Sequence, residues 1–224
     1  MRYRKLPYKI QGANSPAELL LLQKQFCVLV NDLIIRGVEL IFVDETTCHL
    51  WHHAGLRTWH PPNSDLFHEL PATRGKGVAL MGAISTASQS IVLRTYDRNN
   101  SINFLEFLKP VAGMARNARQ TVVVMDNATY HRNLKVKDFL NSRGIGLLYL
   151  PPSSSELNPI EFIWGHIKRR LQKRLLESRQ RILQRDFRPM VVEVAYEYGV
   201  FTNGSIIANA VSSKILRPLE GFLV

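Results

Sequence analysis

The chain has 224 residues, 46% of them hydrophobic, which is enough for one large domain with a buried core and excludes a disordered tail. No apolar run approaches the roughly eighteen residues of a membrane-spanning helix. Lysine and arginine number 29 against 18 acidic residues, so the net charge is +11 and the pI is about 10.0. A basic domain of this size indicates a polyanionic partner, with nucleic acid favoured over an acidic protein or an anionic membrane surface.

The first predicted elements are a helix and three strands. Ser15, Pro16 and Glu18 form a helix-start pattern, and Gly37 is a fitting stop. The segment VELIFVDET (38–46) predicts a buried strand that ends at Asp44. Segments 77–85 and 89–97 predict two more strands, which a short polar turn joins into a hairpin.

Helices and strands alternate in the second half of the chain. We expect a helix over 101–116, kinked or split by Pro110, then a strand over 121–126. A helix over 132–144, a strand over 145–152 and a strong helix over 158–176 follow, and a last helix is expected over 190–200, after Pro189. The order predicts an α/β domain whose mixed sheet is antiparallel in the hairpin and parallel across the helical crossovers.

Three carboxylates stand at the expected positions of a functional site. Asp44 and Asp126 each follow a buried strand, and sites in α/β sheets lie beyond the carboxyl ends of parallel strands. Glu161 lies near the start of the strong helix, just after the last strand. Alternative interpretations remain: an aspartate at a strand end can bond its own turn, and Asn158 with Glu161 is also a capping-box pattern.

Two neighbouring residues have open roles. Glu45 follows Asp44 and should point to the opposite face of the strand, as a supporting or structural residue. His131 could contact a DNA phosphate or cap the following helix.

The two cysteines form neither a disulfide framework nor a paired metal motif, so a reducing interior compartment is expected. A cluster of possible zinc ligands, none at the usual motif spacing, comprises Cys48, His49, His52, His53 and His60. A loop or hairpin that projects onto DNA is the preferred interpretation of this region. RGKG (74–77) lacks the spacing of a phosphate-binding P-loop, and the positive charge argues against a glycosidase that uses two carboxylates.

Basic residues concentrate between 168 and 188. Nine lysines and arginines face Glu177 and Asp186 there, a net charge of +7 (nine minus two). A solvated helix face is the ordinary interpretation, but so few acids in the segment favour phosphate contact. The residues expected to contact DNA on the helix that carries Glu161 are Lys168, Arg169, Gln172 and Lys173.

Three blocks resemble the signature blocks of mariner-type transposases: IFVDET (41–46), VVVMDNATYH (122–131) and LPPSSSELNPIEFIWGHIKRRL (150–171). The 34 residues between Asp126 and Glu161 are typical of the glutamate-bearing (DDE) branch. The resemblance covers roughly residues 3–190. It implies a ribonuclease H-like fold with a five-stranded mixed sheet flanked by helices. The block before Leu157 departs from the family's more frequent Tyr-Ser-Pro-Asp, since this chain has Ser153-Ser154-Ser155-Glu156.

The resemblance also implies an activity. Asp44, Asp126 and Glu161 would be the catalytic triad and hold two Mg²⁺, or Mn²⁺, for hydrolysis at element ends and DNA strand transfer. Double-stranded DNA is then the substrate, a homodimer on DNA is expected, and no small-molecule substrate or membrane is involved. The chain would act in the nucleus of a eukaryote or in the cytoplasm and nucleoid of a bacterium. The alternatives are a ribonuclease H-like nuclease that does not transpose and a domesticated DNA-binding protein.

The expected domain organisation has three parts. Residues 1–37 form a linker remnant and leading helix, and residues 38–190 form the catalytic core, with a DNA-facing insertion near 48–75 that includes Arg57. Residues 191–224 form a C-terminal helical extension. The family's helix-turn-helix modules would precede the core, and only about forty residues precede Asp44, so we interpret the chain as a catalytic core.

Overall fold

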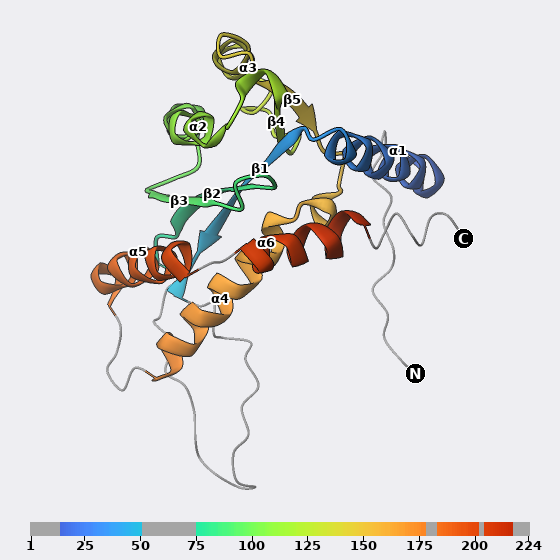
Figure 1. Cartoon of the computed structure of the whole chain (residues 1–224). Coiled ribbons are helices and arrows are strands. Elements are labelled where there is room, and N and C mark those ends of the chain that lie inside the picture. The colour runs from blue at the N-terminus through green and yellow to red at the C-terminus, as the bar shows by residue number, and fades with distance from the viewer. Residues whose placement is uncertain (1–13, 51–74, 178–182, 202–203, 217–224) are drawn as a thin grey trace, which may run out of the picture.

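The computed structural model describes residues 14–50, 75–177, 183–201 and 204–216 (Figure 1). Its centre is a sheet of the order β3-β2-β1-β4-β5. The strands are β1 (Glu39–Cys48), β2 (Val78–Ser85), β3 (Ile91–Tyr96), β4 (Thr121–Met125) and β5 (Gly146–Tyr149). β1, β2 and β3 pair antiparallel, whereas β1 with β4 and β4 with β5 pair parallel. The mixed sheet expected from the order of elements is confirmed.

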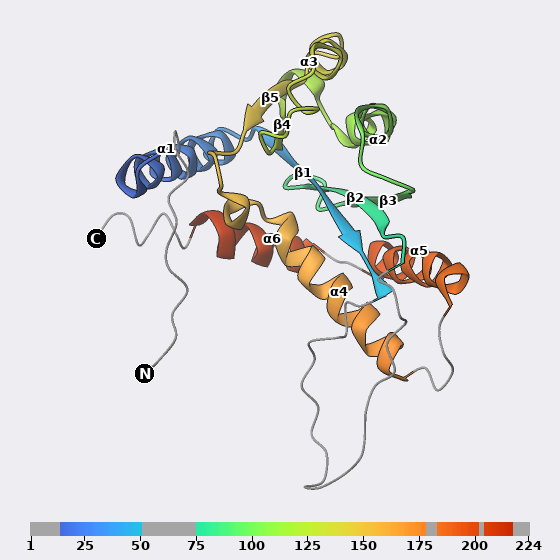
Figure 2. The same cartoon turned by 180° about the vertical axis from the view of Figure 1, so that it is seen from behind.

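Helices cover both faces of the sheet (Figures 1 and 2). On one face α2 (Ser101–Met114) and α3 (Leu134–Asn141) pack against β-strand residues such as Ile41 and Val43. On the other face, residues such as Leu40 and Phe42 share a core with a second group of helices. That group comprises α1 (Pro16–Ile35), α4 (Ile160–Glu177), α5 (Gln184–Phe201) and α6 (Gly204–Val211), followed by a π-helical turn, Ser212–Leu216. Alternation along β1 therefore sends odd and even positions into two different cores.

β1 differs from its predicted form because it does not end at Asp44. Its parallel pairing with β4 stops at Phe42, opposite Val124, but its antiparallel pairing with β2 continues to Cys48. The longer neighbour β2 supplies the backbone hydrogen bonds that keep β1 extended. Asp44 consequently lies inside a strand, beyond the point where the parallel partner ends.

Two prolines are tolerated inside helices against expectation. α2 runs unbroken through Pro110. α5 begins at Gln184 and contains Pro189, so the helix expected after that proline starts before it. Because Pro189 lies early in α5, its missing N–H removes only one bond, to the Arg185 carbonyl.

The expected boundary between core and extension, at residue 190, falls inside α5. Phe187 and Val191 of α5 and Ile207 of α6 are buried in the core that also contains α4. The described part of the C-terminal region is thus packed on the sheet. Residues 51–74, with Arg57 and most of the expected DNA-facing insertion, lie outside the described residues, as do residues 1–13. Among the helices that the structure describes, none has the length and apolar character needed to cross a membrane.

Candidate active site

The parallel pairing of β1 with β4 places Asp44 and Asp126 at matching positions on the two strand directions. The last parallel pair joins Phe42 to Val124, and each aspartate lies two residues further along its own strand direction. Side chains alternate faces, so Asp44 shares the face of Phe42, and Asp126, just past the end of β4, continues the direction of Val124. Asp44 is thereby placed on the side of the sheet where α4 begins, and Asp126 lies beside that strand, at the end of β4.

Asp44 is held by a tryptophan one turn into α4. Trp164 Nε1 donates a hydrogen bond of 2.9 Å to Asp44 Oδ2. Burial raises the pKa of Asp44 to about 7; the Trp164 hydrogen bond opposes this rise, and the charges of Glu45 and Glu161 add to it. Asp44 is therefore a carboxylate that a nearby cation would help to ionise. The apolar spacing of Trp164 along α4 is that of a core residue, so the sequence did not predict this bond; its position one turn after Glu161 was the available signal.

Gly82 lets Trp164 reach this position. It is opposite Asp44 in the β1–β2 pair, and a Cβ there would stand 2.5 Å from Trp164 Cη2 and 2.9 Å from Ile160 Cδ1. Only a residue without a side chain allows α4 to lie this close to the sheet.

Asp126 is held from the other side by His131. His131 Nδ1 lies 2.5 Å from Asp126 Oδ1, and His131 Nε2 lies 2.9 Å from Glu45 Oε1. Burial alone would lower the pKa of His131, but hydrogen bonds to Asp126 and Glu45 raise it to about 9. The same His131 bond lowers the pKa of Asp126, against the effect of burial. A charged imidazole thus joins two carboxylates and keeps Asp126 ionised.

Neither predicted role of His131 matches this position. The ring is fully buried, so it presents no surface to a DNA phosphate, and Asn133 is the residue that caps α3. Phe104 and Tyr130 pack on the ring at centroid distances of 4.2 and 4.4 Å. Glu45 does point away from Asp44, and its link to Asp126 through His131 could not be seen from spacing alone.

Glu161 starts α4 without acting as its cap. The backbone N–H of Asn158, which a capping glutamate would bond, donates instead to the Ser155 carbonyl at 2.9 Å. The Asn158 side chain donates to the Val43 carbonyl at 3.2 Å and so ties the helix start to β1 beside Asp44. Within the described part of the chain, the Glu161 carboxylate accepts no hydrogen bond. This geometry removes the capping explanation of the residue.

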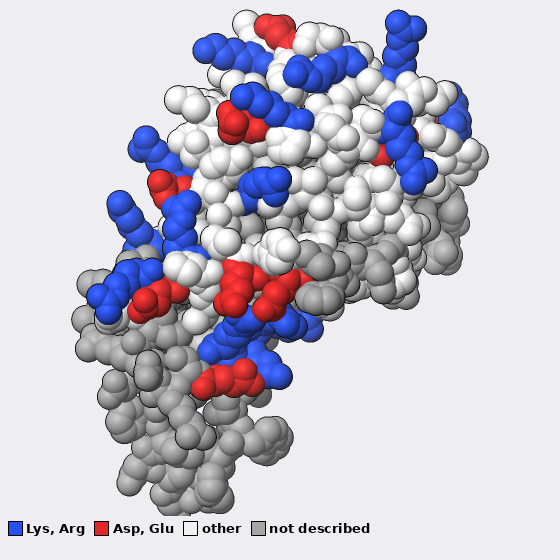
Figure 3. Space-filling view, turned by 60° about the vertical axis from the view of Figure 1, so that its left-hand side comes forward, with Lys and Arg blue, Asp and Glu red and all other residues white. Residues whose placement is uncertain are grey.

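The basic face of α4 is partly neutralised by α5. Arg170 pairs with Glu197, and Arg174 pairs with Glu193 and Glu197. The segment itself holds few acids, as its sequence indicates, but α5 brings others from further along the chain. Figure 3 shows acidic side chains adjoining several of the basic ones on one face of the molecule.

The residues predicted to contact DNA on α4 have different surroundings. Lys168 is half-buried and Arg169 is exposed, and neither forms an ion pair with any described residue. Lys173 is exposed and lies 3.6 Å from Glu177, and Gln172 is half-buried. Lys168 and Gln172 follow Glu161 at helical spacing, so they lie on the same face of α4 as Glu161, further along the helix.

The donor set suits a hard divalent cation rather than zinc. Asp44 and Asp126 follow the last parallel pair of neighbouring strands, and the charge of Glu161 acts on Asp44. Carboxylate oxygens are the ligands that Mg²⁺ prefers. In the described residues no three acidic, histidine or cysteine side chains lie close enough together to hold one ion. Cys48 is buried, which raises its pKa to about 11 and disfavours the thiolate that zinc needs; His52, His53 and His60 lie outside the described residues.

The sheet order and the helices on both faces define a ribonuclease H-like fold. Residues 39–183 match the family model described as DDE superfamily endonuclease, and the chain belongs to this family. It is 27% identical to the Tcb1 transposase of Caenorhabditis briggsae over 140 residues, which are 59% of this chain and 51% of that protein. It is 30% identical to the Tc1 transposase of Caenorhabditis elegans over 100 residues, which are 43% and 37% of the two chains.

Solved structures of mariner transposases share the fold. A Mos1 transposase paired-end complex superposes with a TM-score of 0.70 at 14% identity, over 98% of this chain and 66% of that one. The catalytic domain of Mos1 mariner transposase superposes with a TM-score of 0.61 at 13% identity, over 96% and 97% of the two chains. The match covers about half of the Caenorhabditis briggsae relatives' length. The predicted family and fold are confirmed.

Proposed function

We propose that this chain is the catalytic core of a DNA transposase that cuts and joins phosphodiester bonds with divalent metal ions. The observation that carries the proposal is the position of Asp44 and Asp126 after the last parallel pair of neighbouring strands, with Glu161, which does not cap its helix, close enough for its charge to raise the pKa of Asp44. The relatives' names and the Mos1 complexes with transposon ends support DNA as the substrate. Mos1 structures with Mg and with Mn support these two cations.

Each carboxylate would have a defined task. Asp44, central in the sheet, would contact two ions, whereas Asp126 and Glu161 would each hold one. When bound, the two ions would activate the attacking oxygen and stabilise the charge of the phosphate and the leaving oxygen. Trp164 holds one oxygen of Asp44, and His131 holds Oδ1 of Asp126, so each aspartate enters the site in a fixed orientation.

The surrounding residues support this assignment through position and charge. Asn158 fixes the start of α4 against β1, which sets where Glu161 enters. Lys168 and Arg169 lie further along the helix and can contact the DNA backbone. A homodimer on DNA would bring two such cores to two element ends. The chain would act in the nucleus of a eukaryote or in the nucleoid of a bacterium.

The direct test is incubation of the chain with supercoiled plasmid and Mg²⁺ or Mn²⁺, with EDTA as the control. We expect nicked and linear products only with the metal. A chain that binds plasmid but never cuts it, with either metal, would instead be a domesticated DNA-binding protein. Cutting without joining of a 3′ end to target DNA would indicate a nuclease that does not transpose.

Asp126→Asn tests the site itself. Asparagine keeps the size of the side chain but cannot neutralise a divalent cation, so nicking should fall by orders of magnitude. Retention of DNA in a gel-shift assay should remain near the parent level, because binding depends on basic residues. A variant that nicks plasmid at the parent rate would eliminate Asp126 from the site.

A further inference from the structure

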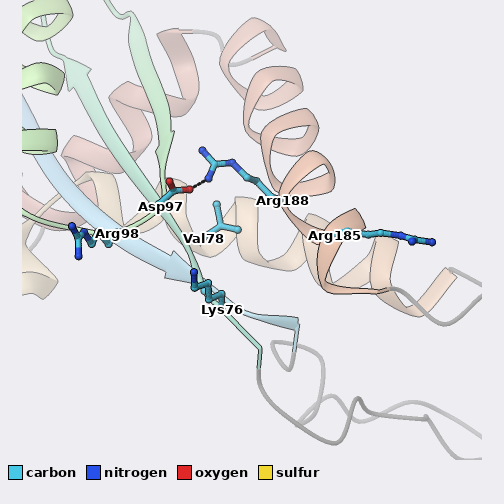
Figure 4. Close-up of a pocket in the computed structure, with 7 residues that line it drawn as sticks. Lys76, Val78, Asp97, Arg98, Arg185 and Arg188 are labelled. Atoms are coloured by element: carbon cyan, nitrogen blue, oxygen red, sulfur yellow. Dashed lines mark hydrogen bonds and ion pairs between the residues drawn. The ribbon is translucent and has the colours of Figure 1, made fainter.

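A basic groove lies at the β2–β3 side of the sheet, away from α3 and β5. It has a volume of about 720 Å³ and is formed by the chain just before β2, the end of β3 and the first turns of α5 (Figure 4). The residues that line it are Lys76, Gly77, Val78, Asp97, Arg98, Arg185 and Arg188. Four cations thus face one carboxylate, and two of them, Arg185 and Arg188, belong to the basic segment 168–188 for which the sequence favoured phosphate contact.

The cations of the groove are arranged in a row rather than around one point. Arg188 crosses from α5 to pair with Asp97, and in Figure 4 Arg98 and Arg185 extend to opposite sides of that pair. Arg98 is exposed and forms no ion pair among the described residues, and Arg185 lies 3.7 Å from Asp186, where both side chains are largely exposed. Diverging cations do not converge on one small anion. They fit an extended chain of negative charges.

The position of the groove relative to Asp44 follows from strand register. Asp44 is opposite Gly82 and Cys48 is opposite Val78, so the groove begins four residues before Gly82 on β2, in the direction in which β1 continues. At about 3.3 Å per residue this is about 13 Å from Asp44 along the strand. A DNA strand rises about 3.4 Å per nucleotide, so the separation corresponds to about four nucleotides.

We propose that this groove binds the sugar-phosphate backbone of the substrate DNA a few nucleotides from the phosphate at Asp44. The inference rests on the proposed function where it relates the groove to a phosphate at Asp44. The charge and shape of the groove do not depend on that function. Arg98 and Arg185 make the phosphate contacts, and the Arg188–Asp97 pair holds α5 against the end of β3 and so keeps the groove open.

The experiment compares Arg98→Gln/Arg185→Gln with the parent chain and leaves the Arg188–Asp97 pair intact. Lys135→Gln/Lys137→Gln is the matched control, because it removes the same charge from exposed positions on α3. Binding to a labelled 24-base-pair duplex of arbitrary sequence is measured in EDTA over a salt series. Each lost phosphate contact lowers the log–log salt slope by about 0.9, so the groove variant should lose about 1.8 and the control almost nothing.

Two results would overturn the proposal: an unchanged slope in the groove variant, or an equal loss in the control. An unchanged slope together with lost binding to a polyglutamate peptide would assign the groove to an acidic protein. Plasmid nicking with Mg²⁺ gives a second readout. The groove variant should need several-fold more DNA for half-maximal rate and keep the parent rate at saturation, and an unaltered DNA requirement would also contradict us. If the parent chain cuts no DNA, the proposed function is refuted. The salt slopes measured in EDTA then still show whether the groove binds DNA.

Discussion

Glu18 and Glu161 show that one sequence pattern can have two structural outcomes. Glu18 forms a true capping box, because its Oε2 accepts from Ser15 N at 2.7 Å and Ser15 Oγ accepts from Glu18 N. At Glu161 the equivalent N–H is already bonded to Ser155, so the carboxylate is left for another use. The spacing is the same in both places and a proline follows each cap residue, but the caps are Ser15 and Asn158, and a short helical turn precedes Asn158.

Glu161→Gln should abolish metal-dependent cutting and leave folding nearly intact. The lost charge at a helix start costs at most about 0.3–1 kcal/mol, whereas a neutral amide cannot replace an anionic metal ligand. The denaturation midpoint and the Mg²⁺-dependent nicking rate should be measured on one preparation. Glu18→Gln is the control and should cut DNA like the parent. A Glu161→Gln chain that cuts normally would remove Glu161 from the triad.

Asp44 should make the metal-free protein less stable as pH rises. Its pKa is raised to about 7 in the folded chain from the ordinary 3.8. Between these values the folded state holds a proton that the unfolded state has released, so stability falls by up to about 1.4 kcal/mol per pH unit and levels off above pH 7. Asp44→Asn lacks this titration and keeps an acceptor for Trp164. In EDTA, urea unfolding from pH 4.5 to 8 should therefore show a growing advantage of the variant, and parallel pH curves would contradict the assignment.

At the scale of elements, the site depends on how closely α4 lies against β1 and β2. Gly82 provides the space, Trp164 fills it and reaches Asp44, and Asn158 fixes the helix start to the backbone of Val43. Three local choices of residue type therefore set one distance, that between the Glu161 end of α4 and the sheet.

Gly82→Ala should push Trp164 off Asp44. The added Cβ would stand 2.5 Å from the indole, so α4 must shift, and overpacking of this kind costs about 1–3 kcal/mol. We expect a lower melting temperature and a loss of nicking larger than the loss of stability explains at 25 °C. Gly113→Ala in α2 is the control, because nothing lies within 4 Å of its Cβ position, and alanine there should stabilise the helix. Equal melting temperatures and nicking rates of the two variants would show that the space between α4 and β2 can hold an extra methyl group.

For the whole molecule, the distribution of charge matters more than its sum. α5 neutralises the second half of the basic α4 face, while the first half and the groove at Arg98 and Arg185 keep their charge. The net +11 is thus divided between cations that hold helices together and cations that face solvent.

Releasing the α4 arginines should strengthen DNA binding. In Glu193→Gln/Glu197→Gln, Arg170 and Arg174 lose their partners, so up to two more phosphate contacts become possible and the salt slope should steepen by up to about 1.8. Thermal stability should decrease modestly. Glu106→Gln/Asp138→Asn removes the same number of acids from exposed positions on α2 and α3 and controls for total charge. Identical slopes in the two variants would mean that the ion pairs do not limit binding.

Much of this arrangement could be predicted from local sequence. The features that could not be predicted depend on contacts between residues far apart in the chain. Valine-rich strands, helix starts and the three carboxylates all follow from residue type and spacing. The length of β1 could not, because the partner that extends it, β2, begins thirty positions beyond the strand's end at Cys48. For the same reason the sequence did not predict the hydrogen-bonded chain Glu45–His131–Asp126 or the ion pairs between α4 and α5. Nor did it predict the helix through Pro189, which the packing of Phe187 and Val191 stabilises.

The order of strands has a consequence for how the enzyme comes into being during synthesis. β1, β2 and β3 follow one another in the chain and pair with each other, so they can form early, whereas β4 joins β1 later and Glu161 follows later still. A partly made or truncated chain that lacks α4 therefore lacks the third carboxylate, whatever else has formed. The proposed nuclease activity is therefore absent until α4 has been made and has packed against β1 and β2.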